Sequence, residues 1–181
     1  MSNAATTAPT SARDQRMPRD RPALHLRGPL LVGPQQEVDE AWVLDGRIHH
    51  QRPDLPAGTE LLEIDGFVVP GLADLHCHLG ISDRGTGTTL PGARAQALTD
   101  RDTGVLLIRD AGSIIDTSAL QQQTDLPRLI RCGRHIARTR RYLIGYAEEV
   151  EPEDLPRAVA HQAARGDGWV KLVGEIGRAH V

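Results

Sequence analysis

The run VVPGLADLHCHLG, residues 68–80, contains the change of pattern on which the fold prediction rests. Its Pro70-Gly71 step separates two different patterns of sequence. The segment before it is turn-rich and strand-like, whereas after it short apolar runs alternate with helical segments. Such alternation indicates a parallel sheet with helices on its faces. Both an open doubly wound sheet and a closed barrel fit this rhythm, and no G-x-G-x-x-G run supports a dinucleotide site.

Residues 72–78, LADLHCH, form the first predicted strand after this break. Further strands are predicted at 104–110, 127–133 and 169–174, and helices at 91–104, 116–123 and 152–166. Gly104 is placed to end the first of these helices. Pro156 is compatible with the last one only if that helix begins late, because proline removes a backbone donor.

The segment 21–70 is predicted to be part of a small β-sandwich subdomain. Asp45-Gly46 lies between AWVL (41–44) and RIHH (47–50), and Asp-Gly suits the tight turn of a β-hairpin. ELLEI (60–64), Asp65-Gly66 and FVV (67–69) repeat the pattern, so a second hairpin is expected. Residues 1–20, which are rich in small residues, proline and arginine, are expected to form a disordered tail.

The composition excludes several classes of partner. The chain has 181 residues, a net charge of −3 and only 3% aromatic residues, which argues against nucleic-acid binding. No apolar run approaches the roughly 20 residues that a membrane helix needs, and none resembles a signal peptide. We therefore expect a cytoplasmic protein with a small-molecule substrate, which when complete could form a homo-oligomer.

His76 and His78 are the first candidate metal ligands. They lie two positions apart in a predicted strand, so both imidazoles should share one face while Cys77 faces the other way. Two neutral imidazoles on one strand can hold a divalent metal ion, and the carboxyl end of a strand is where α/β folds place chemistry. Asp74, two positions earlier, is expected on the same face, either in a lower layer or as a partner of a ligand histidine.

Lys171 is the only lysine in the chain, beside 20 arginines. Where arginine is the routine cation, a retained lysine suggests chemistry that needs an amine able to lose its proton. Lys171 lies at the predicted fourth strand, 93 positions after His78. In a barrel of roughly 250 residues, three of the eight units span about 93 residues, which would bring Lys171 to the same rim as the histidines. A solvated cation at a strand end is the simpler interpretation.

These segments together resemble the metal-dependent amidohydrolase superfamily. VVPGLADLHCHLG (68–80) is similar to its first barrel strand with the H-x-H motif, TGVLLIRDAG (103–112) to its second strand, and WVKLV (169–173) to the fourth strand with the lysine that these enzymes carboxylate. The resemblance covers about residues 41–174.

The resemblance implies an α/β fold: residues 71–174 would form the first half of a distorted TIM barrel, beside a β-sandwich built from both chain ends. It also implies one or two divalent metal ions, with zinc expected, held by His76, His78 and a carboxylated Lys171. The implied activity is hydrolysis of carbon–nitrogen bonds in amide, cyclic amide or dipeptide-like substrates by metal-activated water. Deamination or ester cleavage on the same fold is the neighbouring alternative.

The family pattern also requires two later histidines and a catalytic aspartate, and the chain ends at Val181 before any of them. No catalytic residue is therefore assigned within these 181 residues. The last residues, EIGRAHV (175–181), resemble the translation of a sequencing adapter, so we expect a non-native tail and do not assign His180 as a ligand. The alternative from another class is an inactive truncated fragment, or a non-catalytic binding module of the same fold.

The segment 128–141 contains the weaker candidates. Its arginines could recognise a substrate carboxylate or a nucleic acid, or could simply form a solvated loop. His135, Tyr142 and Arg140 are the predicted substrate contacts, because loops at this rim of a barrel often touch substrate. Asp110, after the second strand, is expected to cap the next turn or to help hold a ligand.

Overall fold

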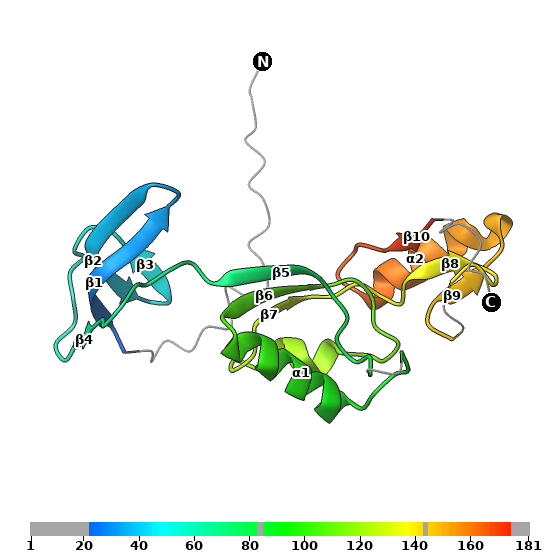
Figure 1. Ribbon diagram of the computed structural model, residues 1–181, viewed down its shortest axis with the longest axis horizontal. Helices are drawn as coiled ribbons and strands as arrows, with labels where there is room; N and C mark the ends of the chain where they lie inside the picture. Colours follow the sequence, from blue (N-terminus) through cyan, green and yellow to red (C-terminus); the bar gives the residue numbers. More distant parts are fainter. Residues whose placement is uncertain (1–21, 83–84, 143–144, 175–181) are drawn as a thin grey trace, which may run out of the picture. The chain divides into compact units, whose positions relative to one another are not determined.

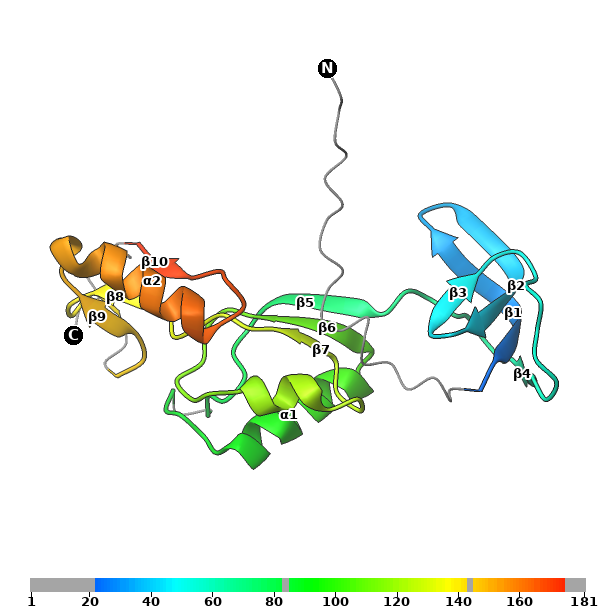
Figure 2. The same ribbon diagram turned by 180° about the vertical axis from the view of Figure 1, so that it is seen from behind.

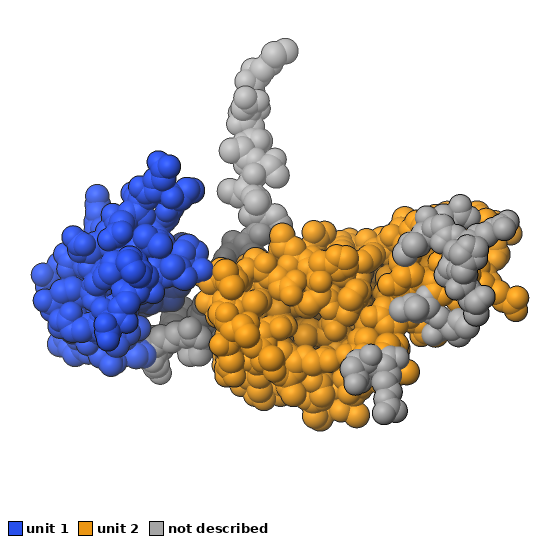
Figure 3. Space-filling model, in the orientation of Figure 1, with its two compact units in different colours: residues 1–70 blue, residues 71–181 orange. Residues whose placement is uncertain are grey.

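The computed structural model describes residues 22–82, 85–142 and 145–174. It divides the chain into two compact units, residues 1–70 and residues 71–181 (Figure 3). The predictions for the tails at 1–20 and 175–181, including His180, concern residues that lie outside the described part of the chain. Within that part, no helix has both the length and the apolar character needed to cross a bilayer.

The first unit contains a four-stranded sheet with the order β3-β2-β1-β4. Its strands are β1 (Leu24–Gly33), β2 (Gln36–Leu44), β3 (Arg47–His49) and β4 (Glu60–Glu63). Strands β2 and β3 are antiparallel, with Leu44 opposite Arg47. Asp45 and Gly46 between them have φ angles of 51° and 73°, as a tight primed turn requires. This confirms the first predicted hairpin.

The second predicted hairpin is wrong. Strand β4 runs parallel to β1 and does not pair with residues 67–69. The amide of Glu60 donates to the Ala23 carbonyl at 3.0 Å, and further along the same edge the Val68 amide donates to the Pro29 carbonyl at 3.0 Å. Both halves of the expected hairpin therefore lie one after the other along β1, which satisfies their backbone groups.

The second unit begins with a three-stranded parallel sheet of order β5-β6-β7. It consists of β5 (Leu72–Cys77), β6 (Val105–Asp110) and β7 (Arg128–Ile130). Helix α1 (Leu90–Asp102) connects β5 to β6 and lies along one face of the sheet (Figures 1 and 2). The Thr89 hydroxyl caps this helix by accepting a hydrogen bond from the Gly92 amide, at 3.2 Å.

Between α1 and the sheet lies a core that we call the α1 core. Its buried side chains are apolar, which stabilises the unit by removing hydrocarbon from water. The α1 core consists of Leu79, Ala93, Ala97, Ile108, Leu120, Leu126 and Leu129. Cys77 packs against it, as the alternation in β5 predicts.

A second small parallel sheet follows, with the order β10-β8-β9. Its strands are β8 (Ile136–Arg138), β9 (Glu148–Val150) and β10 (Leu172–Val173), and the remaining elements are the 3₁₀ helices η1 (Ser118–Gln122) and η2 (Pro152–Asp154) and helix α2 (Leu155–Arg165). The α-helix begins late, at Leu155, as Pro156 requires.

The predicted third strand, 127–133, ends in the structure at Ile130, and the chain forms a further strand at β8. The predicted fourth strand is reduced to two residues in β10. The described residues form a mixed α/β fold with three sheets, and closure of these strands into half of a TIM barrel stays a prediction.

Candidate functional site

His76 and Lys171 meet in the structure although 95 positions separate them. The Lys171 Nζ atom lies 2.5 Å from the Nε2 atom of His76. His76 is exposed on β5, and Lys171 immediately precedes β10. Both side chains therefore direct their terminal nitrogens to one point beside the carboxyl end of β5.

Lys171 approaches the sheet from the face opposite to α1. Two positions before it, the Trp169 ring lies against Arg109, with 4.2 Å between the guanidinium carbon and the ring centroid. Arg109 is exposed between Ile108 and Asp110, both buried, so its side chain points away from the α1 core. The segment 169–171 thus crosses the helix-free face of the sheet.

His78 follows β5, and its ring is held by a backbone carbonyl group of the segment that follows β6. Its Nδ1 atom lies 2.8 Å from the carbonyl oxygen of Gly112. A carbonyl only accepts hydrogen bonds, so Nδ1 must carry the proton and Nε2 must hold the lone pair. This is the tautomer that a metal-binding imidazole needs, with its second nitrogen fixed by a carbonyl group.

Asp74 does not share the histidine face, so that prediction is wrong. A register shift between Asp74 and Cys77 pairs these residues with Ile108 and Asp110, which lie on one face of β6. The charge of Asp74 also contributes to the raised pKa of Asp100 in α1, after burial of that carboxyl group. The Asp74 carboxylate accepts the His76 amide at 2.9 Å and so fixes the backbone of β5 rather than an imidazole.

The electrostatics favour neutral imidazole at this position. Burial lowers the pKa of His78 below 6.5, and the nearby Lys171 and His76 lower it further, against the opposing hydrogen bond to Gly112. Neutral imidazole is the form that binds metal ions.

The residues fit part of a metal site but not a complete one. His76 and His78 offer two imidazole rings with centroids 5.6 Å apart, and Lys171 offers an amine beside His76. Among the residues that the structure describes, however, no group of three histidine, cysteine, aspartate or glutamate side chains is placed to hold a metal ion. A metal bound here would need Lys171 as a ligand, or ligands from outside the described chain.

Of the predicted substrate contacts, the structure brings His135 and Tyr142 to this region. The His135 ring lies 5.8 Å from that of His78 and 5.1 Å from that of Tyr142, measured between centroids. His135 is only 1% exposed, and neither ring nitrogen has a hydrogen-bond partner among the described residues. Its Nδ1 atom faces Gly112, where a Cβ atom would approach it to 2.9 Å. Burial is the main cause that lowers its pKa to about 4.

Arg140 takes part in none of the described contacts of these rings. It is exposed in the turn after β8, with a φ angle of 58°. The neighbouring arginines of this segment are mostly engaged in structure. Arg131 pairs with Asp116 and Asp167, and Arg138 pairs with Glu151. The described contacts therefore favour a structural role for much of the arginine cluster.

Two further buried residues lie near the site: Tyr146, which had no role predicted from sequence, and Asp110, which was predicted to cap the next turn or to help hold a ligand. Tyr146 is 7% exposed, and its ring lies 4.7 Å from that of His135 and 5.8 Å from that of His78. Asp110 is fully buried. One carboxyl oxygen accepts the Gly112 amide at 3.1 Å, the other has no partner among the described residues, and burial raises its pKa to about 7. No periodic signal marks Tyr146, because it lies outside the predicted strands and helices.

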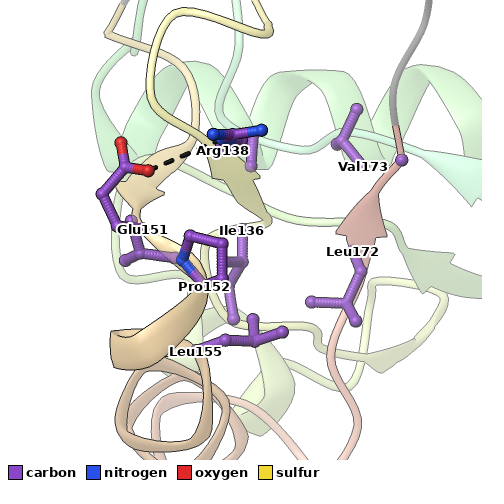
Figure 4. A pocket seen from close by; sticks show the side chains of 10 residues that line it. Ile136, Arg138, Glu151, Pro152, Leu155, Leu172 and Val173 are labelled. Atoms are coloured by element: carbon purple, nitrogen blue, oxygen red, sulfur yellow. Dashed lines mark ion pairs between the residues drawn. The ribbon is translucent and has the colours of Figure 1, made fainter.

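We call His76, His78, His135, Tyr146 and Lys171 the rim cluster. An apolar cavity of about 260 Å³ lies elsewhere in the unit, lined by residues that include Ile136, Leu155 and Leu172 (Figure 4). Ile136 follows His135 and Leu172 follows Lys171, and the two are paired across β8 and β10. None of the residues that line the cavity belongs to the rim cluster.

No model of a known protein family matches the chain. An uncharacterised protein of Mycobacterium tuberculosis strain H37Rv is 49% identical over 160 residues, which cover 87% of this chain and 42% of that protein. An uncharacterised protein of Mycobacterium bovis matches with the same values. The chain thus spans less than half the length of these curated relatives.

Solved structures share the fold. A protein from Bifidobacterium longum, proposed to be a prolidase, aligns with a TM-score of 0.68 at 23% identity, over 86% of this chain and 42% of that one. A Xaa-Pro dipeptidase with methionine bound in its active site aligns with a TM-score of 0.52 at 19% identity, over 79% and 44% of the two chains. At these identities the likeness shows a common fold.

Proposed function

We propose that this chain is the N-terminal part of a metal-dependent hydrolase that cleaves carbon–nitrogen bonds in amide or dipeptide-like small molecules. The observation that carries the proposal is the meeting of Lys171 Nζ and His76 Nε2 at 2.5 Å, beside a His78 ring whose Nδ1 is held by a carbonyl group. Imidazole nitrogens and a carboxylated lysine are ligands that suit a divalent ion such as zinc, which gives this grouping a chemical use.

The names of proteins that share the fold support this reaction class. One is proposed to be a prolidase and another is a Xaa-Pro dipeptidase, and both names describe cleavage of a bond to nitrogen. We extend the proposal to a TIM barrel completed by further chain, because the curated relatives are more than twice as long as the matched segment. A cytoplasmic location, the absence of nucleic-acid partners and homo-oligomer formation belong to the same proposal.

The residues of this chain would divide the work as follows. His76, His78 and a carboxylated Lys171 would hold one or two divalent ions, with zinc expected. When bound, such ions polarise a carbonyl group and lower the pKa of water, which supplies the nucleophile. Lys171 must lose its proton before it can add carbon dioxide, a change that arginine cannot make. The resulting carbamate offers two oxygen ligands.

His135, together with Tyr142, would contact the substrate. A buried imidazole with both nitrogens unpartnered among the described residues loses stabilisation that a hydrogen-bonding substrate group would restore. At neutral pH the lowered pKa keeps this ring uncharged, so one nitrogen can donate to a substrate carbonyl oxygen. Arg140 is proposed to meet a substrate carboxylate, which its exposed position allows.

The competing proposal is that these 181 residues are an inactive fragment or a binding module. The incomplete ligand set among the described residues favours it. The test is to express this chain and the full reading frame side by side and to measure metal content, the mass of the Lys171 peptide, and hydrolysis of a panel of N-acyl amino acids and dipeptides. We expect zinc, one added carbon dioxide and turnover in the full-length protein only. A full-length protein without metal and without hydrolysis would overturn the proposal.

A further inference from the structure

The Tyr146 ring packs against two imidazoles of the rim cluster and against Tyr142, although the proposed function gives it no role. The Tyr146 ring lies 4.7 Å from His135, 5.8 Å from His78 and 5.7 Å from Tyr142, measured between centroids. At 7% exposure it is nearly as buried as the α1 core. A tyrosine packed against three other rings has little freedom to reorient, since close packing resists even small changes of side-chain volume.

The backbone of Tyr146 is held from outside the cluster. The Arg134 Nε atom donates to the Tyr146 carbonyl at 2.9 Å, and the same guanidinium also donates to the Gly145 carbonyl. One planar guanidinium thus spans two successive carbonyl groups, which fixes direction as well as distance. The chain before β9 is therefore anchored to the connection between β7 and β8.

Arg134 is itself fixed by helix α2. The Gln162 side chain, 1% exposed, accepts the Arg134 amide at 2.7 Å and donates to the Glu148 carboxylate. The Glu148 amide in turn donates to the His135 carbonyl at 2.8 Å. A buried amide that satisfies both of its ends rigidifies its surroundings. Helix α2 is thus connected through Gln162 and Arg134 to the segment that carries the rings of His135 and Tyr146.

His78 is the proposed metal ligand that contacts the rings of His135 and Tyr146. Its only described hydrogen bond is the one from Nδ1 to Gly112, at 2.8 Å. A ring held at one atom can still rock about that bond. The Tyr146 ring, at 70° to the His78 plane, packs on a second side of the imidazole.

We propose that Tyr146 is a positioning residue that fixes the orientation of the His78 ring, and that Arg134 and Gln162 hold Tyr146 in place. This inference rests on the proposed metal role of His78. In this proposal Tyr146 acts through the packing of its ring and not through its hydroxyl group, so phenylalanine can replace it. Tyr142 provides the matched control, because its described ring contacts are to His135 and Tyr146 and not to His78.

The first measurement uses the metal-free full-length protein. Histidine is labelled with nitrogen-15, and ring resonances are assigned with His78→Gln and His135→Gln. Tyr146→Leu should move the resonances of both His78 and His135, because a ring current is removed from each. Tyr142→Leu should move chiefly those of His135. Unchanged His78 resonances in a folded Tyr146→Leu protein would overturn the proposal.

The second measurement is a titration with Zn²⁺ alone against a chromophoric chelator. Tyr146→Leu should weaken the affinity by roughly 10-fold, the low end of the effect seen when a group supporting a metal ligand is lost. Tyr146→Phe and Tyr142→Leu should stay within about twofold of wild type. If Tyr146→Phe binds Zn²⁺ as weakly as Tyr146→Leu, ring packing is not what Tyr146 contributes.

His78→Gln separates the two levels of the argument. If His78→Gln leaves Zn²⁺ affinity unchanged, the proposed function fails, and the resonances still decide whether Tyr146 orients His78. If His78→Gln weakens binding while Tyr146→Leu changes neither affinity nor resonances, the inference fails alone. Should Tyr146→Leu not fold, Arg134→Lys takes its place, because an ammonium cannot span both carbonyl groups. Arg138→Lys, in the lining of the cavity, is its control.

Discussion

The α1 core and the rim cluster belong to the same unit, but they differ in the polarity of their buried side chains. The α1 core contains only apolar side chains, and each is explained by its packing. At the rim, buried His135 and Asp110 have polar atoms without partners among the described residues, and Lys171 points at an imidazole. Buried polar groups without partners cost stability. Packing thus accounts for the first region, whereas the second has the unpaired polar groups that the proposed binding and catalysis would use.

The largest effect is expected from a substitution at Lys171 that removes the proposed metal ligand and leaves the fold intact. Lys171→Arg keeps the charge but cannot form a carbamate, so turnover by the full-length protein should fall by roughly 10³-fold, the scale of losing a group that acts on transition-state charge. The thermal midpoint should stay unchanged because Lys171 is only partly buried. Near-normal kcat/KM for the proposed substrates would refute the role of Lys171.

The corresponding change in the α1 core should act on stability alone. Ile108 is 1% exposed, and Ile108→Ala should lower the free energy of unfolding by about 3 kcal/mol through lost burial and a cavity. Below the unfolding temperature, Zn²⁺ affinity should remain within about twofold. Chemical denaturation and a zinc titration on the same sample check both statements, and a tenfold loss of affinity would show that the two regions are coupled.

Acid should distinguish the two buried groups at the rim. Burial lowers the His135 pKa from 6.5 to about 4, so stability from this group falls as pH drops through this range, because only the unfolded chain takes up the proton. Burial raises the Asp110 pKa from 3.8 to about 7, so this group has the opposite effect, since the folded chain holds the extra proton. The two effects offset each other between about pH 4 and 6.5.

Asp110→Asn should therefore expose the histidine effect. The metal-free variant should lose on the order of 2 kcal/mol of unfolding free energy between pH 6.5 and 4, whereas wild type should change little. Urea denaturation across this range is the measurement. Adding His135→Leu to Asp110→Asn should remove the dependence, and a slope that persists would assign it to another group.

Removal of the unpartnered His135 imidazole should have a smaller and opposite effect on the free energy of unfolding. His135→Leu replaces two buried nitrogens without described partners by hydrocarbon and should raise the free energy of unfolding by about 1 kcal/mol. Activity should fall at the same time, because the proposed contact to the substrate is lost. A destabilised variant would mean that His135 belongs with the packing of the fold.

The smallest effect is expected at Arg140. It is exposed in a turn, so Arg140→Gln should change stability by less than about 0.5 kcal/mol. If Arg140 meets a substrate carboxylate, KM should rise while kcat is kept. Equal KM values for acidic and amidated substrates would remove Arg140 from the site.

Sequence predicted the local elements better than their partners. The Asp45-Gly46 turn, the helix after Thr89 and the late start forced by Pro156 all follow from local chemistry. The pairing of β4 with β1 and the register shift after Asp74 could not be predicted, because both depend on hydrogen bonds between segments far apart in the chain.

The same distinction holds at the rim cluster. Strand alternation predicted that His76 and His78 would share a face, and their ring centroids lie 5.6 Å apart, while the rarity of lysine singled out Lys171. Tyr146 gave no such signal, because its position depends on carbonyl groups held by Arg134, and a hydrogen bond to a carbonyl requires no particular residue type. Residues positioned through their own chemistry are visible in sequence, whereas those positioned through backbone contacts are not.

A crystal of the full-length protein measured at the zinc absorption edge tests the convergence of His76, His78 and Lys171 most directly. The proposed site predicts an anomalous peak about 2.0–2.1 Å from one ring nitrogen of each histidine, with density for a carbamate on Lys171. A zinc peak bound elsewhere, or an unmodified Lys171 ammonium hydrogen-bonded to His76 in metal-loaded crystals, would contradict it.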